Sequence, residues 1–146
     1  MERTTGDLDS NAAFRLREAR VARLATAGDD GPSIVPICFV WDGERVYTAV
    51  DRKPKAVAPG EIARVRRIRA HPEVALVLDE YDEDWSRLWY VLVRGRAALV
   101  ADESERTRAI ERLREKYPQY RDGYLPENAP VIRILVERIV SWSAGG

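Results

Sequence analysis

One stretch of the chain, IVPICFVWDGERVYTAV at residues 34–50, decides which fold the rest of the sequence has to complete. Its first part, Ile34–Trp41, is a nearly continuous run of β-forming residues, which is typical of a strand covered on both faces. Asp42-Gly43 follows and is the strongest short hairpin signal in the chain. Arg45–Val50 is the expected partner strand. The stretch therefore predicts a β-hairpin.

Four further strands and three helices are predicted around this hairpin. The strands are expected at 20–27, 74–78, 88–100 and 131–142, and the helices at 11–19, 61–70 and 102–117. Gly95 interrupts the long third strand of this set, which indicates a bulge or bend. Most strands follow one another as hairpin neighbours, so the expected fold is mainly β (α+β): a six-stranded antiparallel barrel with flanking helices.

Length and charge restrict the class of protein. The 146 residues are expected to form a single domain over 1–146, with a flexible N-terminus at 1–9. Lys and Arg number 24, as do Asp and Glu, so no net field draws the chain to nucleic acid or an anionic membrane. There is neither a long apolar run nor an apolar leader, and a cytoplasmic location is expected.

No strong catalytic signature is present in the sequence. Phosphate-binding glycine loops, a nucleophile elbow and a zinc-protease motif are all missing. The single cysteine, Cys38, and single histidine, His71, exclude a conventional Cys/His zinc site. The acidic residues of 79–84 lack the spacing of a calcium loop, which favours a solvated loop. We therefore expect no metal, and no catalytic residue is assigned.

The lysines are distributed unevenly. Only Lys53, Lys55 and Lys116 occur, and the other 21 basic residues are arginines. Lys53 and Lys55 flank Pro54 in the loop that precedes the second helix. A phosphate in that loop would meet two ammonium groups and the N–H groups of the helix terminus. The alternative is a pair of exposed surface lysines, which spacing alone favours.

Two tryptophans lie before and within the long strand. A planar cofactor ring could stack on Trp89, although core packing is the commoner fate of a strand tryptophan. We expect Trp89 to contribute to an interface or to the wall beside a ring. Trp85 follows an acidic stretch, so we expect it to be more exposed.

Taken in order, these segments resemble the pyridoxamine 5'-phosphate oxidase-like superfamily of split β-barrel flavin-binding proteins. The resemblance runs from about Phe14 to Trp142. It rests on RVARLAT at 20–26, PSIVPICFV at 32–40, VYTAVD at 46–51, HPEVAL at 71–76, and on DRKPK at 51–55 with DEYDEDWSRLW at 79–89. The last two stretches are similar to those of the actinobacterial branch of probable F420-dependent oxidoreductases.

The resemblance implies a homodimer with two cofactor sites between the subunits. The cofactor would be the deazaflavin coenzyme F420 or, alternatively, FMN. Val35, Pro36 and Ile37 match positions that line the ring. The strand end and loop that hold phosphate in the family correspond to Val50, Arg52, Lys53 and Lys55. The resemblance therefore favours phosphate binding by the lysine pair, although its spacing alone does not.

Three functions follow from the resemblance and stay open at this point. The first is hydride transfer from reduced F420 to a small unsaturated organic substrate, with the redox chemistry carried by the cofactor. The second is an FMN-dependent oxidoreductase on the same scaffold. The third is a non-catalytic carrier of flavin or F420. Arg52 and Lys53 do not match the basic pattern of true pyridoxamine phosphate oxidases, so pyridoxine metabolism is not expected.

Overall fold

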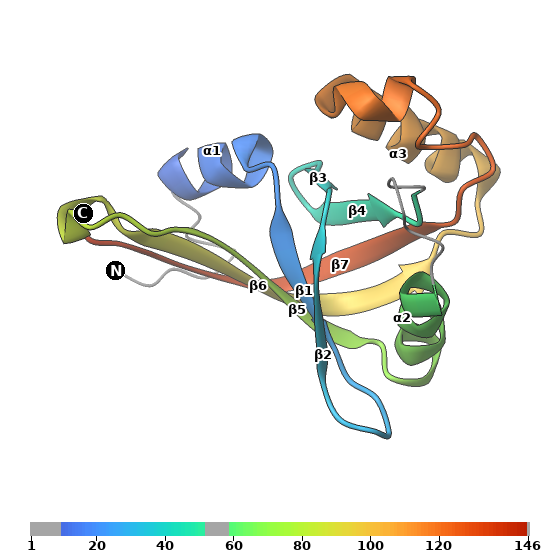
Figure 1. Ribbon diagram of the computed structural model, residues 1–146, viewed down its shortest axis with the longest axis horizontal. Helices are drawn as coiled ribbons and strands as arrows, with labels where there is room; N and C mark the ends of the chain where they lie inside the picture. Colours follow the sequence, from blue (N-terminus) through green and yellow to red (C-terminus); the bar gives the residue numbers. More distant parts are fainter. Residues whose placement is uncertain (1–9, 52–58, 146) are drawn as a thin grey trace.

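The computed structural model describes residues 10–51 and 59–145, and the N-terminus predicted to be flexible lies outside this part. Its strands form one antiparallel sheet in the order β2-β1-β5-β6-β7-β4-β3, curled into a half-barrel (Figure 1). The elements are α1 (Ser10–Glu18), β1 (Ala22–Thr26), β2 (Ser33–Ile37), β3 (Val40–Trp41), β4 (Arg45–Ala49), α2 (Pro59–Ala70), β5 (Glu73–Glu80), η2 (Trp85–Arg87), β6 (Trp89–Leu99), α3 (Glu103–Lys116), η3 (Pro118–Arg121) and β7 (Val131–Ser143).

The mainly β (α+β) class and the antiparallel half-barrel are confirmed, but the described residues hold seven strands, not six. The additional strand arises because the run Ile34–Trp41 breaks at Cys38-Phe39. The part before the break pairs with β1, and the part after it pairs with β4. Since β2 and β3 are the two edges of the sheet, this one run carries the chain from one edge to the other.

Side chains from elsewhere in the chain satisfy the backbone at the break. The Tyr117 hydroxyl lies 3.0 Å from both the nitrogen and the carbonyl oxygen of Phe39. The Thr48 hydroxyl donates to the Cys38 carbonyl at 2.7 Å. A ladder interrupted at two residues therefore leaves few polar groups unpaired.

The predicted hairpin is confirmed for β3 and β4. The Asp42 backbone N–H donates to the Arg45 carbonyl at 3.0 Å, which leaves Gly43 and Glu44 as the two turn residues. Gly43 has a φ of +102°, a conformation that favours glycine. The Asp42 carboxylate accepts from the backbone of Glu44 and Arg45, which fixes the turn.

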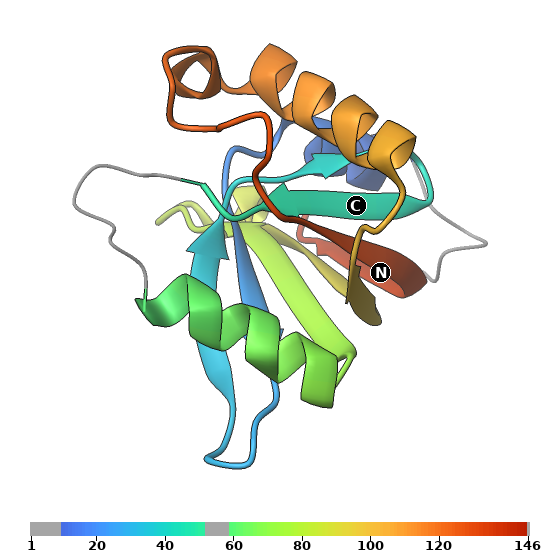
Figure 2. The ribbon, with the colours of Figure 1, turned by 90° about the vertical axis from the view of Figure 1, so that its right-hand side faces the viewer.

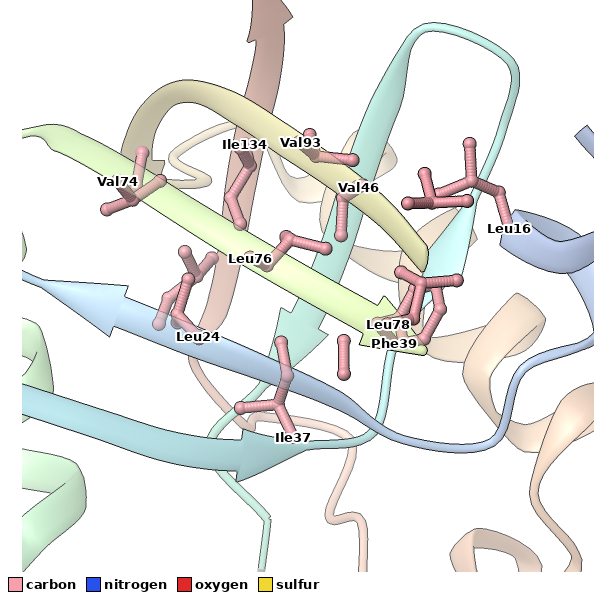
Figure 3. Packing of buried hydrophobic residues seen from close by; sticks show 14 of the residues in the cluster. Leu16, Leu24, Ile37, Phe39, Val46, Val74, Leu76, Leu78, Val93 and Ile134 are labelled. Atoms are coloured by element: carbon pink, nitrogen blue, oxygen red, sulfur yellow. The ribbon is translucent and has the colours of Figure 1, made fainter. Parts of the chain in front are cut away.

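Two clusters of buried side chains hold the sheet and helices together. The first fills the half-barrel with alternate residues of its strands, including Leu24, Leu76, Val93 and Ile134, and is closed by Leu16 of α1 (Figure 3). The second lies between α3 and the β3–β4 edge; its members are Val40, Tyr47, Ala49, Val100, Ala109, Ile110, Leu113, Tyr117, Tyr120, Leu125, Ala129 and Val131. In Figure 2, α3 lies on one side of the sheet and α2 on the other.

Helix α3 begins where the sequence predicts, directly after Asp102, which caps it. The Asp102 carboxylate accepts from the Glu105 backbone N–H at 2.9 Å. The Glu105 carboxylate binds the Arg133 guanidinium at 2.9 Å and the Tyr47 hydroxyl at 2.7 Å. Burial opposes the ionisation of Glu105, but these hydrogen bonds outweigh it and lower its pKa. The contact ties α3 to β4 and β7.

The β5–β6 connection forms the tip of an arm that extends beyond the half-barrel (Figure 1). Trp85 in this tip is 68% exposed, as expected, whereas Trp89 is half-buried. Asp82 accepts from the Asp84 backbone, and Asp84 caps η2, so the carboxylates of Asp82 and Asp84 bind the backbone of the turn that contains them.

In residues 10–51 and 59–145, no group of three metal-ligating side chains gathers, and no helix is long and apolar enough to cross a membrane.

Candidate cofactor-binding site

Strand β2 offers an apolar edge on which a flat ring could lie. It pairs with β1 on one side only and is therefore an edge of the sheet. Ile34 is 68% exposed and Pro36 is exposed, while Val35 is half-buried against the core and Ile37 is buried. Proline is tolerated there because an edge strand has one side without ladder partners. These residues fit a planar, largely apolar group.

The end of β4 lies beside the end of β2. The Thr48-to-Cys38 hydrogen bond joins the two ends, and the Val50 backbone N–H donates to Pro130 at 2.9 Å. Asp51 is buried and accepts from the Tyr120 hydroxyl. Burial and the Asp51 hydrogen bond raise the pKa of Tyr120, so the phenol keeps its proton and donates. The strand end that precedes the lysine pair is thus fixed in place.

The predicted phosphate ligands follow this strand end. Arg52, Lys53 and Lys55 lie outside the described residues, and the next described element, α2, begins at Pro59. Their assignment to phosphate therefore stays a prediction. Of the predicted site residues that are described, Val35–Ile37 lie on β2 and Val50 directly follows β4, and the Thr48-to-Cys38 hydrogen bond links these two strand ends.

Trp89 lies elsewhere in the same chain. Its ring is 4.6 Å from the Arg15 guanidinium of α1, and its Nε1 donates to Glu80 at 2.9 Å. Pro36 lies on β2, opposite Arg23 of β1. In the sheet order, β2 is three strands from β6, the strand that holds Trp89. One chain does not bring Trp89 beside the β2 edge. The two belong to one site only if different protomers supply them.

A groove of about 600 Å³ runs between α1 and Trp89. Phe14 and Val21 line it and are 59% and 45% exposed. Val21 directly precedes β1, and Phe14 belongs to α1.

The third lysine, Lys116, is held by the β2–β3 break. Its amine donates to the Phe39 carbonyl at 2.9 Å and lies 4.1 Å from the centre of the Phe39 ring. Burial, with the nearby Arg20 guanidinium, lowers the pKa of Lys116 to about 8. This amine therefore loses its proton at a lower pH than an exposed lysine and is still mainly protonated at pH 7.

We expect this lowered pKa to give a measurable pH dependence of stability. Between the folded pKa of about 8 and the ordinary 10.5, the unfolded chain binds a proton that the folded chain does not. Stability then rises with pH in this window. From about pH 7 to about pH 9.5 the parent should gain about 1 kcal/mol relative to Lys116→Met, after allowance for solvent screening. Urea unfolding at both pH values measures this, and parallel pH curves for the two proteins would contradict it.

An antiparallel half-barrel with an open apolar edge next to a fixed strand end is the architecture of split-barrel cofactor-binding proteins. The family model described as "Pyridoxamine 5'-phosphate oxidase" matches residues 10–144, and the chain belongs to this family. No curated protein sequence matches the chain.

Solved structures share the fold. A conserved hypothetical protein from Mycobacterium tuberculosis is 22% identical with a TM-score of 0.73, over 94% of this chain and 85% of that one. A FAD-binding protein from Mesorhizobium loti is 25% identical with a TM-score of 0.66, over 97% and 96%. A protein described as an F420 reductase is 23% identical with a TM-score of 0.62, over 90% and 98%. Family and fold together support flavin-type cofactor binding.

Proposed function

We propose that this protein is an oxidoreductase that binds F420 and passes a hydride from the reduced coenzyme to a small unsaturated organic substrate. The observation that carries the proposal is the exposed apolar edge of β2 beside the fixed end of β4. The fold shared with an F420 reductase supports the choice of coenzyme.

The proposed site has two parts in one protomer. In the first part, Val35, Pro36 and Ile37 would lie along the ring, on a strand that pairs only with β1 among the described residues. The phosphate is assigned to Val50 and to the segment with Arg52, Lys53 and Lys55. Trp89 of a second copy forms a wall beside the ring, because within one chain it lies away from β2.

The bound coenzyme supplies the redox chemistry, and the chain supplies binding, orientation and exclusion of water. The apolar β2 edge covers one side of the ring and desolvates it. Arg52, Lys53 and Lys55 would hold the phosphate end of the coenzyme by charge-assisted hydrogen bonds. A second protomer then limits access of water from the open side.

FMN is the alternative coenzyme. The observation that favours it is the likeness to the FAD-binding protein from Mesorhizobium loti, since a flavin is the group named for that relative. FMN and F420 both present a tricyclic ring and a phosphate. The residues assigned above serve either one.

Absorbance titration of the purified protein with F420 and with FMN tests the proposal, followed by turnover of the reduced coenzyme with a panel of unsaturated acceptors. We expect tighter binding of F420 and oxidation of the reduced coenzyme by at least one acceptor. Tighter binding of FMN would favour the flavin alternative. Tight binding without turnover over a broad panel would favour a carrier, and failure to bind either coenzyme would overturn the proposal.

We expect the protein to be a homodimer in solution. A site that combines the β2 edge with Trp89 needs two copies, and a two-fold contact is the simplest way to supply them. Light scattering at micromolar concentration should give twice the 16.6 kDa of the chain. A strictly monomeric mass would contradict the dimer and would show that Trp89 is not part of the proposed site.

A further inference from the structure

Helices α1 and α3 both contact β3, and a surface pocket of about 460 Å³ opens where the three meet. Figure 1 shows these elements on the opposite side of the molecule from the turn that joins β1 and β2. The pocket is lined by four cationic side chains, two carboxylates and two apolar residues: Arg17, Arg20, Arg112, Lys116, Glu18, Glu115, Val40 and Trp41. Positive charge is therefore in excess.

The cations of this pocket are not neutralised by ion pairs. In the described part of the chain, no carboxylate lies within 4 Å of the four cationic groups, whereas Arg23, Arg67 and Arg133 each have such a partner. The two carboxylates of the pocket, on Glu18 and Glu115, are exposed. An added anion could therefore bind these cationic groups without displacing a carboxylate from an ion pair.

Two of the cations are held in place by neutral groups. The Arg20 guanidinium donates to the Lys116 carbonyl at 2.6 Å and lies 4.7 Å from the centre of the Tyr117 ring. The Lys116 amine donates one hydrogen bond, to Phe39, which leaves further N–H groups for a ligand. Their mutual repulsion also contributes to the lowered pKa of Lys116. Glu18 offsets part of this repulsion, and the four cationic side chains still outnumber the two carboxylates of the pocket.

We propose that this pocket binds a small oxyanion that carries phosphate or carboxylate groups. Arginine forks and a lysine amine are the side chains that bind such groups most strongly, through charge-assisted hydrogen bonds. A bound anion stabilises the protonated, positively charged form of Lys116, and this charged form in turn binds the anion more strongly. Phosphate binding must therefore raise the pKa of this amine.

Inorganic phosphate is the probe. It is titrated into the Lys53→Ala/Lys55→Ala protein, so that the loop assigned to the coenzyme phosphate does not contribute. Acetylation of Lys116 is followed by peptide mass spectrometry at pH near its pKa, with chloride at matched ionic strength as reference. We expect saturable protection, with acetylation several-fold slower in phosphate than in chloride. Equal rates at all concentrations would overturn the proposal.

Variants on α3 separate a site from general charge. Arg112→Ala should weaken phosphate binding about tenfold, the lower end for loss of a charge-assisted hydrogen bond. Arg108→Ala, one turn earlier on the same helix and outside this pocket, removes the same charge and should leave phosphate binding unchanged. Lys116→Met, measured by calorimetry, should bind phosphate more weakly. Equal losses in Arg108→Ala and Arg112→Ala would show a diffuse charge effect and overturn the proposal.

Competition identifies the source of the anion. If F420 displaces phosphate from Lys116, the pocket holds an anionic part of that coenzyme. If saturating F420 or FMN leaves the protection of Lys116 unchanged, the pocket takes a separate phosphate or carboxylate ligand. In both cases the pocket is an anion site, and its test does not depend on whether the coenzyme assignment holds.

Discussion

Replacing Gly95 by alanine is expected to destabilise the protein by about 3 kcal/mol or more, at the upper end of overpacking costs. A Cβ on Gly95 would lie 2.2 Å from the Leu135 carbonyl oxygen and 2.9 Å from Ile134 Cγ2. The carbonyl belongs to the neighbouring strand β7, so relief requires movement of the backbone. The β6–β7 register shifts between Arg94 and Gly95, which confirms the bulge predicted from this glycine.

Gly123→Ala is the matched control for this change. Gly123 has a φ of +94°, but no atom lies within 4 Å of a Cβ built on it. Its replacement should destabilise by only about 1 kcal/mol, through backbone strain alone. Urea unfolding of both variants compares the two. Similar losses would mean that close approach of β6 and β7 at Gly95 is not what fixes the bulge.

Lys55→Ala should bind the phosphate-bearing coenzyme about ten- to a hundredfold more weakly, which corresponds to loss of a charge-assisted contact of about 1.5–3 kcal/mol. The melting temperature of the protein without coenzyme should stay nearly constant, since loss of a loop lysine changes stability by at most ~0.5 kcal/mol. Riboflavin has the flavin ring but lacks the phosphate, so its binding should change far less. Fluorescence or absorbance titration gives all three affinities.

Arg69→Ala provides the control for charge. Arg69 is an exposed cation at the end of α2, and its loss should leave coenzyme binding unchanged. If Lys53→Ala, Lys55→Ala and the double variant all bind FMN and F420 like the parent, the lysine pair is surface charge. The coenzyme phosphate would then have to lie elsewhere on the half-barrel.

Local patterns in the sequence predicted most strands and helices because their causes are local. Alternating apolar residues mark β5, and Asp102 caps α3. The break at Cys38-Phe39 escaped prediction, since the groups that satisfy it, Tyr117 and Thr48, come from distant parts of the chain. A continuous apolar run gives no sign that its two halves pair with different strands.

The candidate sites differ in the same way. Val35–Ile37 and Val50 follow from a resemblance that preserves their order along the chain, and the structure brings their strand ends together. The anion pocket combines α1 with α3, about ninety residues apart. In an arginine-rich chain, nothing in the spacing of Arg17, Arg20 and Arg112 distinguishes them from exposed surface arginines.

A crystal structure of the protein with bound coenzyme tests the central claim most directly. We predict a two-fold dimer with the ring of F420 along Val35–Ile37 of one protomer and the phosphate on Lys53 and Lys55 of that protomer. Trp89 of the second copy should face the ring. A ring bound away from β2, or a phosphate that touches neither lysine, would contradict the account.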